Sequence, residues 1–322
     1  MLADWLKLHD MNKTPIIIDC DPGHDDAIML MLAFGCDLFD IKAVTISAGN
    51  QTQDKTLNNA LKVLTLIGHQ TRVFRGAEKP MVNQLLIAGD IHGKTGLDGP
   101  DLPEPAFQPE EKTAIEGLAE IIAASEEKIT LVVTGPETNI ALFLQAYPEL
   151  KSKIEKLVIM GGGFGRGNIT PRAEFNIYVD PEAASIVFNA GIPIVMCGLD
   201  VTHQALIYEE DIQKFRELGN KTGGVVAELL DFFSQYYRKN RPELGGGVAL
   251  HDPCTIAWMI NPAIFQSKPC HVSIELKGEF TRGETVVDFY DALRKEPNAE
   301  VVFNIDREGF MRLLLENVQR LP

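Results

Sequence analysis

Four aspartates stand close together near the N-terminus, within residues 19–26 (DCDPGHDD). Two carboxylates about 4 Å apart repel each other by several kcal/mol at intermediate dielectric. A bound cation, helix N-terminal amides or a raised pKa must offset such repulsion. Because the side-chain ligands are oxygens, a cation held here would be a hard one, Ca²⁺ or Mg²⁺. A capping loop with solvated acids is the simpler alternative, and the spacing leaves it open.

A second polar segment surrounds an aromatic residue. Asn168, Glu174 and Asn176 stand close to Phe175 in the sequence. Carboxylates and amides of this kind suit paired hydrogen bonds to neutral hydroxyls, such as those of a sugar. A polar surface loop would have the same composition, so the pattern predicts a sugar site without excluding that alternative.

Two histidines also stand in segments of interest. His251 comes directly before Asp252-Pro253 and is either an acid near neutral pH or an ordinary loop residue. Asp252 has the type and position of a helix N-cap, with Pro253 as the first helical residue. His92 lies in a glycine-rich stretch at residues 91–99, a composition that indicates mobility near a cleft.

The elements that must position these residues alternate along the chain. Apolar, strand-like runs occur at 15–19, 41–47, 129–134, 156–160 and 192–197, and segments with helical spacing at 27–34, 56–67, 114–124, 139–144 and 181–189. This alternation predicts an open, mostly parallel, doubly wound α/β sheet with helices on both faces. The later part is more helical, at 209–218, 224–238 and 307–315, with strands between 272 and 304. We expect one domain over 14–322, preceded by an extension at 1–13.

Polar residues and glycines follow the predicted strands. They occur at 19–26, 47–50, 134–139, 160–163 and 198–200, directly after the apolar runs. In open α/β sheets, ligands bind beyond the carboxyl ends of the strands. The sequence therefore predicts one site along a single edge of the sheet.

Composition excludes some partners. The 322 residues include 30 Lys plus Arg and 45 Asp plus Glu, a formal net charge of −15. Such a chain is poorly suited to nucleic acid or an anionic membrane, which both need clustered basic residues. No apolar run approaches the roughly 18 residues of a membrane span, and the N-terminus lacks a secretory signal pattern. The five cysteines form no CxxC motif, so we expect buried thiols and a cytoplasmic protein.

These motifs together resemble the inosine-uridine preferring nucleoside hydrolases. Residues 19–27 resemble the N-terminal signature of that family, and further matching segments follow in the family's order: SAGN at 47–50, IHG at 91–93, TGP at 134–136, MGG at 160–162, AEFN at 173–176 and HDP at 251–253. The resemblance covers residues 14–322 and is closest to bacterial ribonucleoside hydrolases that favour pyrimidines. A histidine at position 251 differs from the tryptophan of the purine-specific branch.

The resemblance implies calcium-dependent hydrolysis of the N-glycosidic bond of ribonucleosides in nucleoside salvage, by a tetrameric or dimeric enzyme. It implies a Ca²⁺ site formed by Asp21, Asp26, Asp252 and the backbone carbonyl of Thr134. Asp21 would also act as the general base, and His251 would protonate the leaving base. The ribose contacts implied are Asp25, Asn50, Met160, Asn168, Glu174 and Asn176. On the base side the resemblance implies Phe175 and His92, and in the region of uncertain register it suggests Tyr237 and Arg241.

Three other functions are compatible with parts of the sequence. Specificity could be broad, or directed to inosine and uridine rather than pyrimidines. The start Asp19-x-Asp21 also resembles haloacid-dehalogenase phosphatases, with Asp19 as nucleophile and Asp21 as acid, although Gly23 replaces the expected Thr or Val. The third alternative is a catalytically silent nucleoside-binding protein on the same fold.

Overall fold

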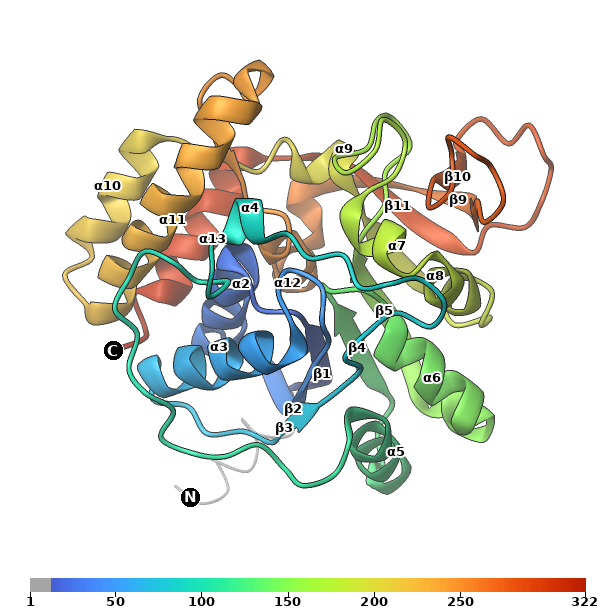
Figure 1. The fold of residues 1–322 in the computed structure, drawn as a ribbon, viewed down its shortest axis with the longest axis horizontal. Helices are drawn as coiled ribbons and strands as arrows, with labels where there is room; N and C mark the ends of the chain where they lie inside the picture. Colours follow the sequence, from blue (N-terminus) through green and yellow to red (C-terminus); the bar gives the residue numbers. More distant parts are fainter. Residues whose placement is uncertain (1–12) are drawn as a thin grey trace.

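The computed structural model describes residues 13–322, and the extension expected at 1–13 lies outside them except for Lys13. The central sheet contains nine strands in the order β10-β9-β11-β6-β5-β4-β1-β2-β3 (Figure 1). All neighbours are parallel except the pairs that β9 forms with β10 and β11. The mostly parallel α/β fold is therefore confirmed. The strands are β1 (Thr14–Cys20), β2 (Phe39–Ile46), β3 (Val73–Arg75), β4 (Ile129–Val133), β5 (Ile154–Met160), β6 (Ile194–Cys197), β9 (Phe265–Ile274), β10 (Thr285–Asp288) and β11 (Ala299–Ile305).

Helices cover both faces of the sheet, so side chains alternate along β1 between two cores. Ile16 and Ile18 belong to one hydrophobic cluster and Ile17 to the other, as the two-residue period of a strand requires. The first cluster packs α2 (His24–Gly35), α3 (Gln53–Leu66), α10 (Glu209–Glu217), α11 (Lys221–Asn240), α12 (Pro253–Ile260) and α13 (Arg307–Val318). The second packs α5 (Ala114–Ala124), α6 (Thr138–Ala146) and α8 (Pro181–Phe188).

Short elements complete the fold. The helices α4 (Gly89–His92), α7 (Phe175–Val179) and α9 (Leu199–Thr202) lie in connections, and β7 (Leu206–Ile207) pairs with β8 (Val248–Ala249). Short 3₁₀ helices occur at η1 (Pro148–Lys153), η2 (Pro242–Leu244) and η3 (Pro262–Ile264). Such elements, like the three-residue β3, are too short to produce a hydrophobic period, so the sequence pattern does not reveal them.

One predicted boundary is wrong in a way that affects the site. The first helix was expected at 27–34, but α2 begins at His24, so Asp25 and Asp26 lie in its first turn. The Gly23 amide donates to Asp26 Oδ2 over 2.9 Å, closing the turn. Acidic residues in a first turn interact favourably with the free amides of a helix N-terminus. These two carboxylates are therefore held by helical backbone rather than by a flexible loop.

The direction of winding reverses beside β1. The chain runs from β1 to β2 on one side and, after β3, returns to β4 on the other side of β1. Crevices form where two successive connections diverge in this way, beyond the carboxyl ends of the strands. This reversal brings residues 21–26 after β1 close to Thr134 after β4. Among residues 13–322, no helix has the length and apolarity needed to cross a membrane.

Candidate active site

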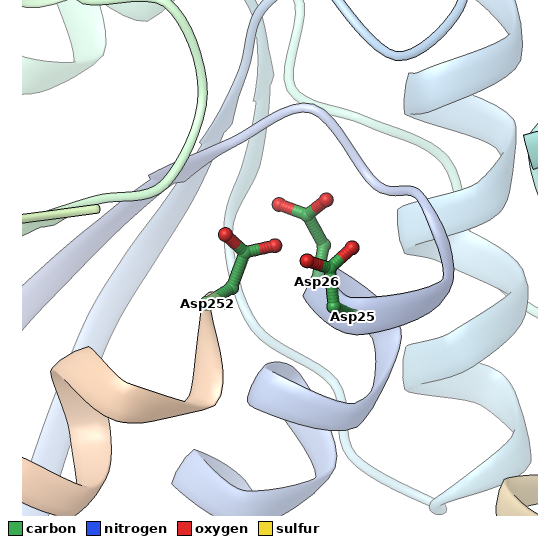
Figure 2. Close-up of side chains that lie close together, drawn as sticks. All are labelled: Asp25, Asp26 and Asp252. Atoms are coloured by element: carbon green, nitrogen blue, oxygen red, sulfur yellow. The ribbon is translucent and has the colours of Figure 1, made fainter. Parts of the chain in front are cut away.

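Three carboxylates meet at the carboxyl edge of the sheet (Figure 2). Asp25 and Asp26 come from the first turn of α2, and Asp252 stands just before α12, pointing toward them. One oxygen of each lies within 4.8 Å of the others, and all three side chains are buried. Asp252 occupies the predicted N-cap position, but its side chain makes no capping hydrogen bond. It faces the other carboxylates instead, an arrangement that could hold a metal ion.

A fourth carboxylate, Asp21, lies beside this group and is fully buried. Its Oδ2 accepts a hydrogen bond from the backbone amide of Asn50 over 2.6 Å, whereas its Oδ1 has no hydrogen-bond partner among the described residues. Two glycines close around it: a Cβ on Gly49 would lie 2.1 Å from Oδ2, and one on Gly135 would lie 2.8 Å from Oδ1. A buried carboxylate oxygen without a donor is costly. The packing therefore leaves one oxygen of Asp21 available for a ligand.

The acids cannot all be ionised without compensation. Burial raises the pKa of Asp25 to about 7, with a further contribution from Asp26. Burial also raises the pKa values of Asp21 and Asp252 well above the usual range, and neighbouring carboxylates raise both further. A bound cation would offset both the cost of burying these charges and the repulsion between them. The oxygen-only donors and the unpartnered Oδ1 of Asp21 fit a hard divalent metal.

Neighbouring side chains orient Asp26. Its Oδ2 accepts from Asn50 Nδ2 over 3.0 Å, and its Oδ1 accepts from the Thr134 hydroxyl over 3.0 Å. The backbone carbonyl of Thr134 accepts from Asn176 Nδ2 over 2.8 Å, and this amide also reaches the Met160 carbonyl over 3.1 Å. The loops after β1, β2, β4 and β5 are thus joined to one another by hydrogen bonds beneath the site.

A cavity of about 460 Å³ opens above these carboxylates. Most of the predicted site residues line it: Asp25, Asn50, His92, Thr134, Met160, Asn168, Glu174, Phe175, Asn176, Tyr237, His251 and Asp252. Asp21 and Asp26 are fully buried and do not line it. Arg241 lines an adjoining cavity rather than this one.

One end of the cavity presents polar groups that backbone amides hold in place. Glu174 Oε2 accepts from the amides of Gly162 and Ile177, over 3.0 and 3.2 Å. Asn168 Oδ1 accepts from the amide of Phe175 over 2.9 Å. Glu174 Oε1 and Asn168 Nδ2 make no hydrogen bond among residues 13–322, so each residue keeps one polar atom for a ligand. Burial raises the pKa of Glu174 to about 7.

His251, which also lines the cavity, is held at both ring nitrogens. Its Nδ1 lies 2.7 Å from the Thr202 hydroxyl, and its Nε2 lies 2.8 Å from the Tyr237 hydroxyl. Burial lowers the pKa of His251 well below the usual range, and His203 contributes to that effect. The lowered pKa favours the neutral imidazole, and the Tyr237 hydroxyl is its hydrogen-bond partner at the cavity.

Several residues at the site were missed at the level of sequence. Ala88, Ile91 and Phe233 line the cavity, and Phe233 stacks against His92 with ring centroids 5.3 Å apart. His24, part of the first acidic motif, lies with its Nδ1 3.1 Å from His92 Nδ1. The motif itself contained a signal for His24, whereas the apolar residues look like ordinary core residues in the sequence.

The position of Asp19 argues against a phosphatase. Its carboxylate accepts from Thr45 and Asn139, is almost fully buried, and does not line the cavity. A nucleophilic aspartate must reach its substrate. Asp21 is equally buried, but it lies beyond the end of β1 beside the other carboxylates, whereas Asp19 lies within β1 between β2 and β4. The structure therefore favours Asp21 over Asp19 as a reacting carboxylate.

The fold and the site have the features of a glycosidase. A carboxylate-lined pocket lies at the reversal point of a doubly wound sheet, and His251 and Tyr237 line it together with the carboxylates. Such a pocket stabilises positive charge on a sugar ring while a leaving group departs at the other end.

Comparison with known proteins agrees with this class. Residues 16–312 match the family described as inosine-uridine preferring nucleoside hydrolase. The chain is 54% identical over 306 residues to the pyrimidine-specific ribonucleoside hydrolase RihA of Salmonella paratyphi C (strain RKS4594), covering 95% of this chain and 98% of the relative. It is 57% identical to the protein of the same name from Shewanella sp. (strain ANA-3), over 94% of this chain and 96% of that one.

Solved structures agree on the fold. A purine-preferring ribonucleoside hydrolase from Gardnerella vaginalis superposes with a TM-score of 0.89 at 30% identity, over 95% of this chain and 98% of that chain. A plant nucleoside hydrolase superposes with a TM-score of 0.88 at 29% identity, over 95% of this chain and 99% of that chain. This chain belongs to the inosine-uridine preferring nucleoside hydrolase family, and it is a ribonucleoside hydrolase.

Proposed function

We propose that this chain hydrolyses pyrimidine ribonucleosides, uridine and cytidine, to ribose and free base, with Ca²⁺ in the carboxylate site. The observation that carries this proposal is a cavity lined by Asp25, Asp252 and the Tyr237–His251 pair, with the buried Asp21 and Asp26 beside it. The pyrimidine preference is supported by the two relatives at 54% and 57% identity, both named pyrimidine-specific. A role in cytoplasmic nucleoside salvage and assembly into tetramers or dimers belong to the same proposal.

The metal ligands proposed are Asp21, Asp26, Asp252 and the Thr134 carbonyl. All the proposed donors are oxygens, and Asp21 Oδ1 has no hydrogen-bond partner in the described part of the chain, which supports a hard cation. When bound, Ca²⁺ would offset the repulsion among the carboxylates and lower the pKa of a water molecule. Asp25 belongs to the three-carboxylate group in this structure, so it lies where it can reach both the metal and a ribose hydroxyl.

Asp21 is proposed as the general base. Its Oδ1 has no hydrogen-bond partner among residues 13–322, so this oxygen would accept a proton from water attacking C1′ of the ribose. General-base catalysis contributes roughly 10²–10⁴-fold. Asp25, Asn50, Asn168, Glu174 and Asn176 are proposed to hold the ribose, with Met160 against the ring. The buried carboxylates then stabilise the positive charge that develops on it.

The leaving base is proposed to contact His92, Phe175, Tyr237 and Arg241. The Tyr237 hydroxyl lies 2.8 Å from His251 Nε2. Protonated His251 would pass a proton to the base through this hydroxyl and so return to the neutral imidazole. Burial raises the pKa of Tyr237 well above the usual range, which keeps this hydroxyl protonated. The Thr202 hydroxyl fixes the orientation of the imidazole from the far side.

A nucleoside panel tests the function. Uridine, cytidine, inosine, adenosine and 2′-deoxyuridine are assayed with native protein, with chelated protein, and after Ca²⁺ is restored. We expect uridine and cytidine to be hydrolysed fastest, chelation to abolish turnover and Ca²⁺ to restore it. No hydrolysis of any ribonucleoside by the calcium-loaded protein would leave the binding-protein alternative standing. Light scattering of the same sample tests the oligomeric state.

A further inference from the structure

A side chain from the far end of the sheet reaches the loop that follows β5. In the order of strands, β10 is separated from β5 by β9, β11 and β6. Its first residue, Thr285, is buried and does not line the cavity above the carboxylates. The Thr285 hydroxyl accepts a hydrogen bond from the Gly163 amide over 2.8 Å and donates one to the Gly163 carbonyl over 2.6 Å. One hydroxyl therefore holds both backbone polar groups of a residue 122 positions away in the sequence.

The turn that Thr285 holds has an unusual backbone conformation. Gly162 has a φ angle of +72°, in the left-handed region that favours glycine, and a Cβ on it would lie 2.5 Å from Thr285 Cγ2. The Gly162 carbonyl accepts from the Leu199 amide over 2.8 Å. The Asp200 carboxylate accepts from the two amides that follow Gly163, over 2.6 and 3.0 Å. The loop is thus fixed from β10 and from α9, and this sets the direction of the Gly162 amide.

The Gly162 amide in turn holds a carboxylate of the cavity. It donates to Glu174 Oε2 over 3.0 Å, and the Ile177 amide donates to the same oxygen over 3.2 Å. Glu174 lines the cavity, and its Oε1 is the oxygen left for a ligand. A shift of the turn would withdraw one of the two donors to Oε2 and let the carboxylate rotate. The position of Oε1 therefore depends on the hydroxyl of Thr285, two hydrogen-bonded steps away.

We propose that Thr285 is a positioning residue for the ribose end of the cavity, where the residues proposed to hold the ribose lie. Its hydroxyl fixes the Gly162–Gly163 turn, and the turn holds Glu174 so that Oε1 meets a ribose hydroxyl. This inference rests on the proposed contact between Glu174 and the ribose. A displacement of about 1 Å at a substrate-holding group costs about 10²-fold in rate, so a supporting hydrogen bond of this kind has a measurable kinetic effect.

The first experiment removes the hydroxyl and then restores it. Thr285→Val keeps the branched shape of the side chain without its hydroxyl, and Thr285→Ser keeps the hydroxyl. The control is Thr65→Val, because the Thr65 hydroxyl also accepts from an amide and donates to a carbonyl, in α3 and away from the cavity. Circular dichroism verifies the fold of each variant. The calcium-loaded proteins are assayed on uridine and on 4-nitrophenyl riboside, which share the ribose and differ in the leaving group.

We expect Thr285→Val to lower kcat/KM by about 10- to 100-fold on both substrates, since the ribose is common to them. Thr285→Ser should stay within about 3-fold of the wild type, because a serine hydroxyl can make the same two hydrogen bonds. Thr65→Val should keep the wild-type kcat/KM on both substrates. Should Thr285→Val fail to fold, Thr285→Ala makes the same test without placing a methyl group against the Gly163 peptide.

A double-mutant cycle then asks whether Thr285 acts through Glu174. In a Glu174→Ala background the turn has no carboxylate to hold, so we expect Thr285→Val to lower kcat/KM by a further factor of less than about 2. A loss as large as in the wild-type background would assign Thr285 to the general stability of the fold. That result, wild-type kcat/KM in Thr285→Val, or a failure of Thr285→Ser to restore activity overturns the inference, while hydrolysis by the wild type upholds the proposed function. Absence of hydrolysis by the wild type overturns both.

Discussion

The two ends of the cavity are built in different ways. At the proposed ribose end, most side chains come from the connections after β1, β2, β4 and β5 and from the start of α7, with Asp252 from the residue before α12, and all the acids are buried. Glycines are packed tightly there, with Gly49 and Gly135 against Asp21. At the base end, residues come from α4, α7, α11 and the segment after it. Gly245 and Gly246 in that segment have positive φ angles and open space where a Cβ would point.

The family includes members that are named for different bases. Relatives named pyrimidine-specific and a solved relative named purine-preferring share one fold. Connections after buried strands tolerate little change, because any new atom meets a carboxylate or backbone. A helix end with open space beside it can change its side chains without disturbing the sheet. We infer that the ribose end keeps the common chemistry and the base end sets the preference.

The largest expected effect comes from the ribose end. Asp21→Ala removes the proposed base and a metal ligand together, so we expect kcat to fall by at least about 10³-fold. The fold should be retained, because the change also relieves carboxylate repulsion. Uridine turnover and circular dichroism measure the two effects. Asp54→Ala is the control, since Asp54 is an exposed acid paired with Arg75. Turnover near that of the wild type in Asp21→Ala would contradict its assigned role.

The next comparison is between a tightly packed glycine, Gly49, and an open one, Gly246. Gly49→Ala would place a methyl group 2.1 Å from Asp21 Oδ2, so the carboxylate must move. A displacement of about 1 Å at reacting groups costs about 10²-fold, and we expect at least that loss in kcat. Gly246→Ala meets no neighbouring atom, and its positive φ should cost about 1 kcal/mol of stability without loss of kcat. Equal kinetic losses in both variants would show that the two ends are not built differently.

At the base end, His251→Ala should lower uridine turnover by about 10²-fold. The expected loss on 4-nitrophenyl riboside is much smaller, because that leaving group departs without a proton. Tyr237→Phe should reproduce the pattern, since it removes the hydroxyl between His251 and the cavity. Equal losses on both substrates would exclude a role in leaving-group protonation and assign His251 to the ribose end instead.

The smallest expected effect is on stability rather than rate. Burial raises the pKa of Glu174 from 4.5 to about 7, so the folded state binds a proton more tightly than the unfolded chain. Stability from this group is therefore present below about pH 4.5 and is lost as the pH rises through 7. Between pH 5 and 7.5, the free energy of unfolding of the chelated wild type should fall by about 2 kcal/mol more than that of Glu174→Gln. Urea unfolding at the two pH values measures this, and parallel losses would show that Glu174 ionises normally.

Much of the fold follows from local pattern. The helix predicted at 114–124 is α5, residue for residue, because the Thr113 side chain accepts from Glu116 and caps it. The start of α2 was predicted three residues late. Asp25 and Asp26 look like loop residues in the sequence, yet the Gly23–Asp26 hydrogen bond includes them in the first helical turn.

The sequence by itself determined the alternation of strands and helices, the family, and the segments that carry the site. Those features depend on apolar periodicity and on motifs a few residues long. Only the tertiary structure decided which groups face one another: that Asp252 turns from its capping position toward Asp25 and Asp26, and that Arg241 lies in the cavity beside His251. The aspartates that meet are more than two hundred residues apart in the sequence, so their contact depends on the order of the strands in the sheet. The position of Arg241 depends on the rotation of the helix that it follows.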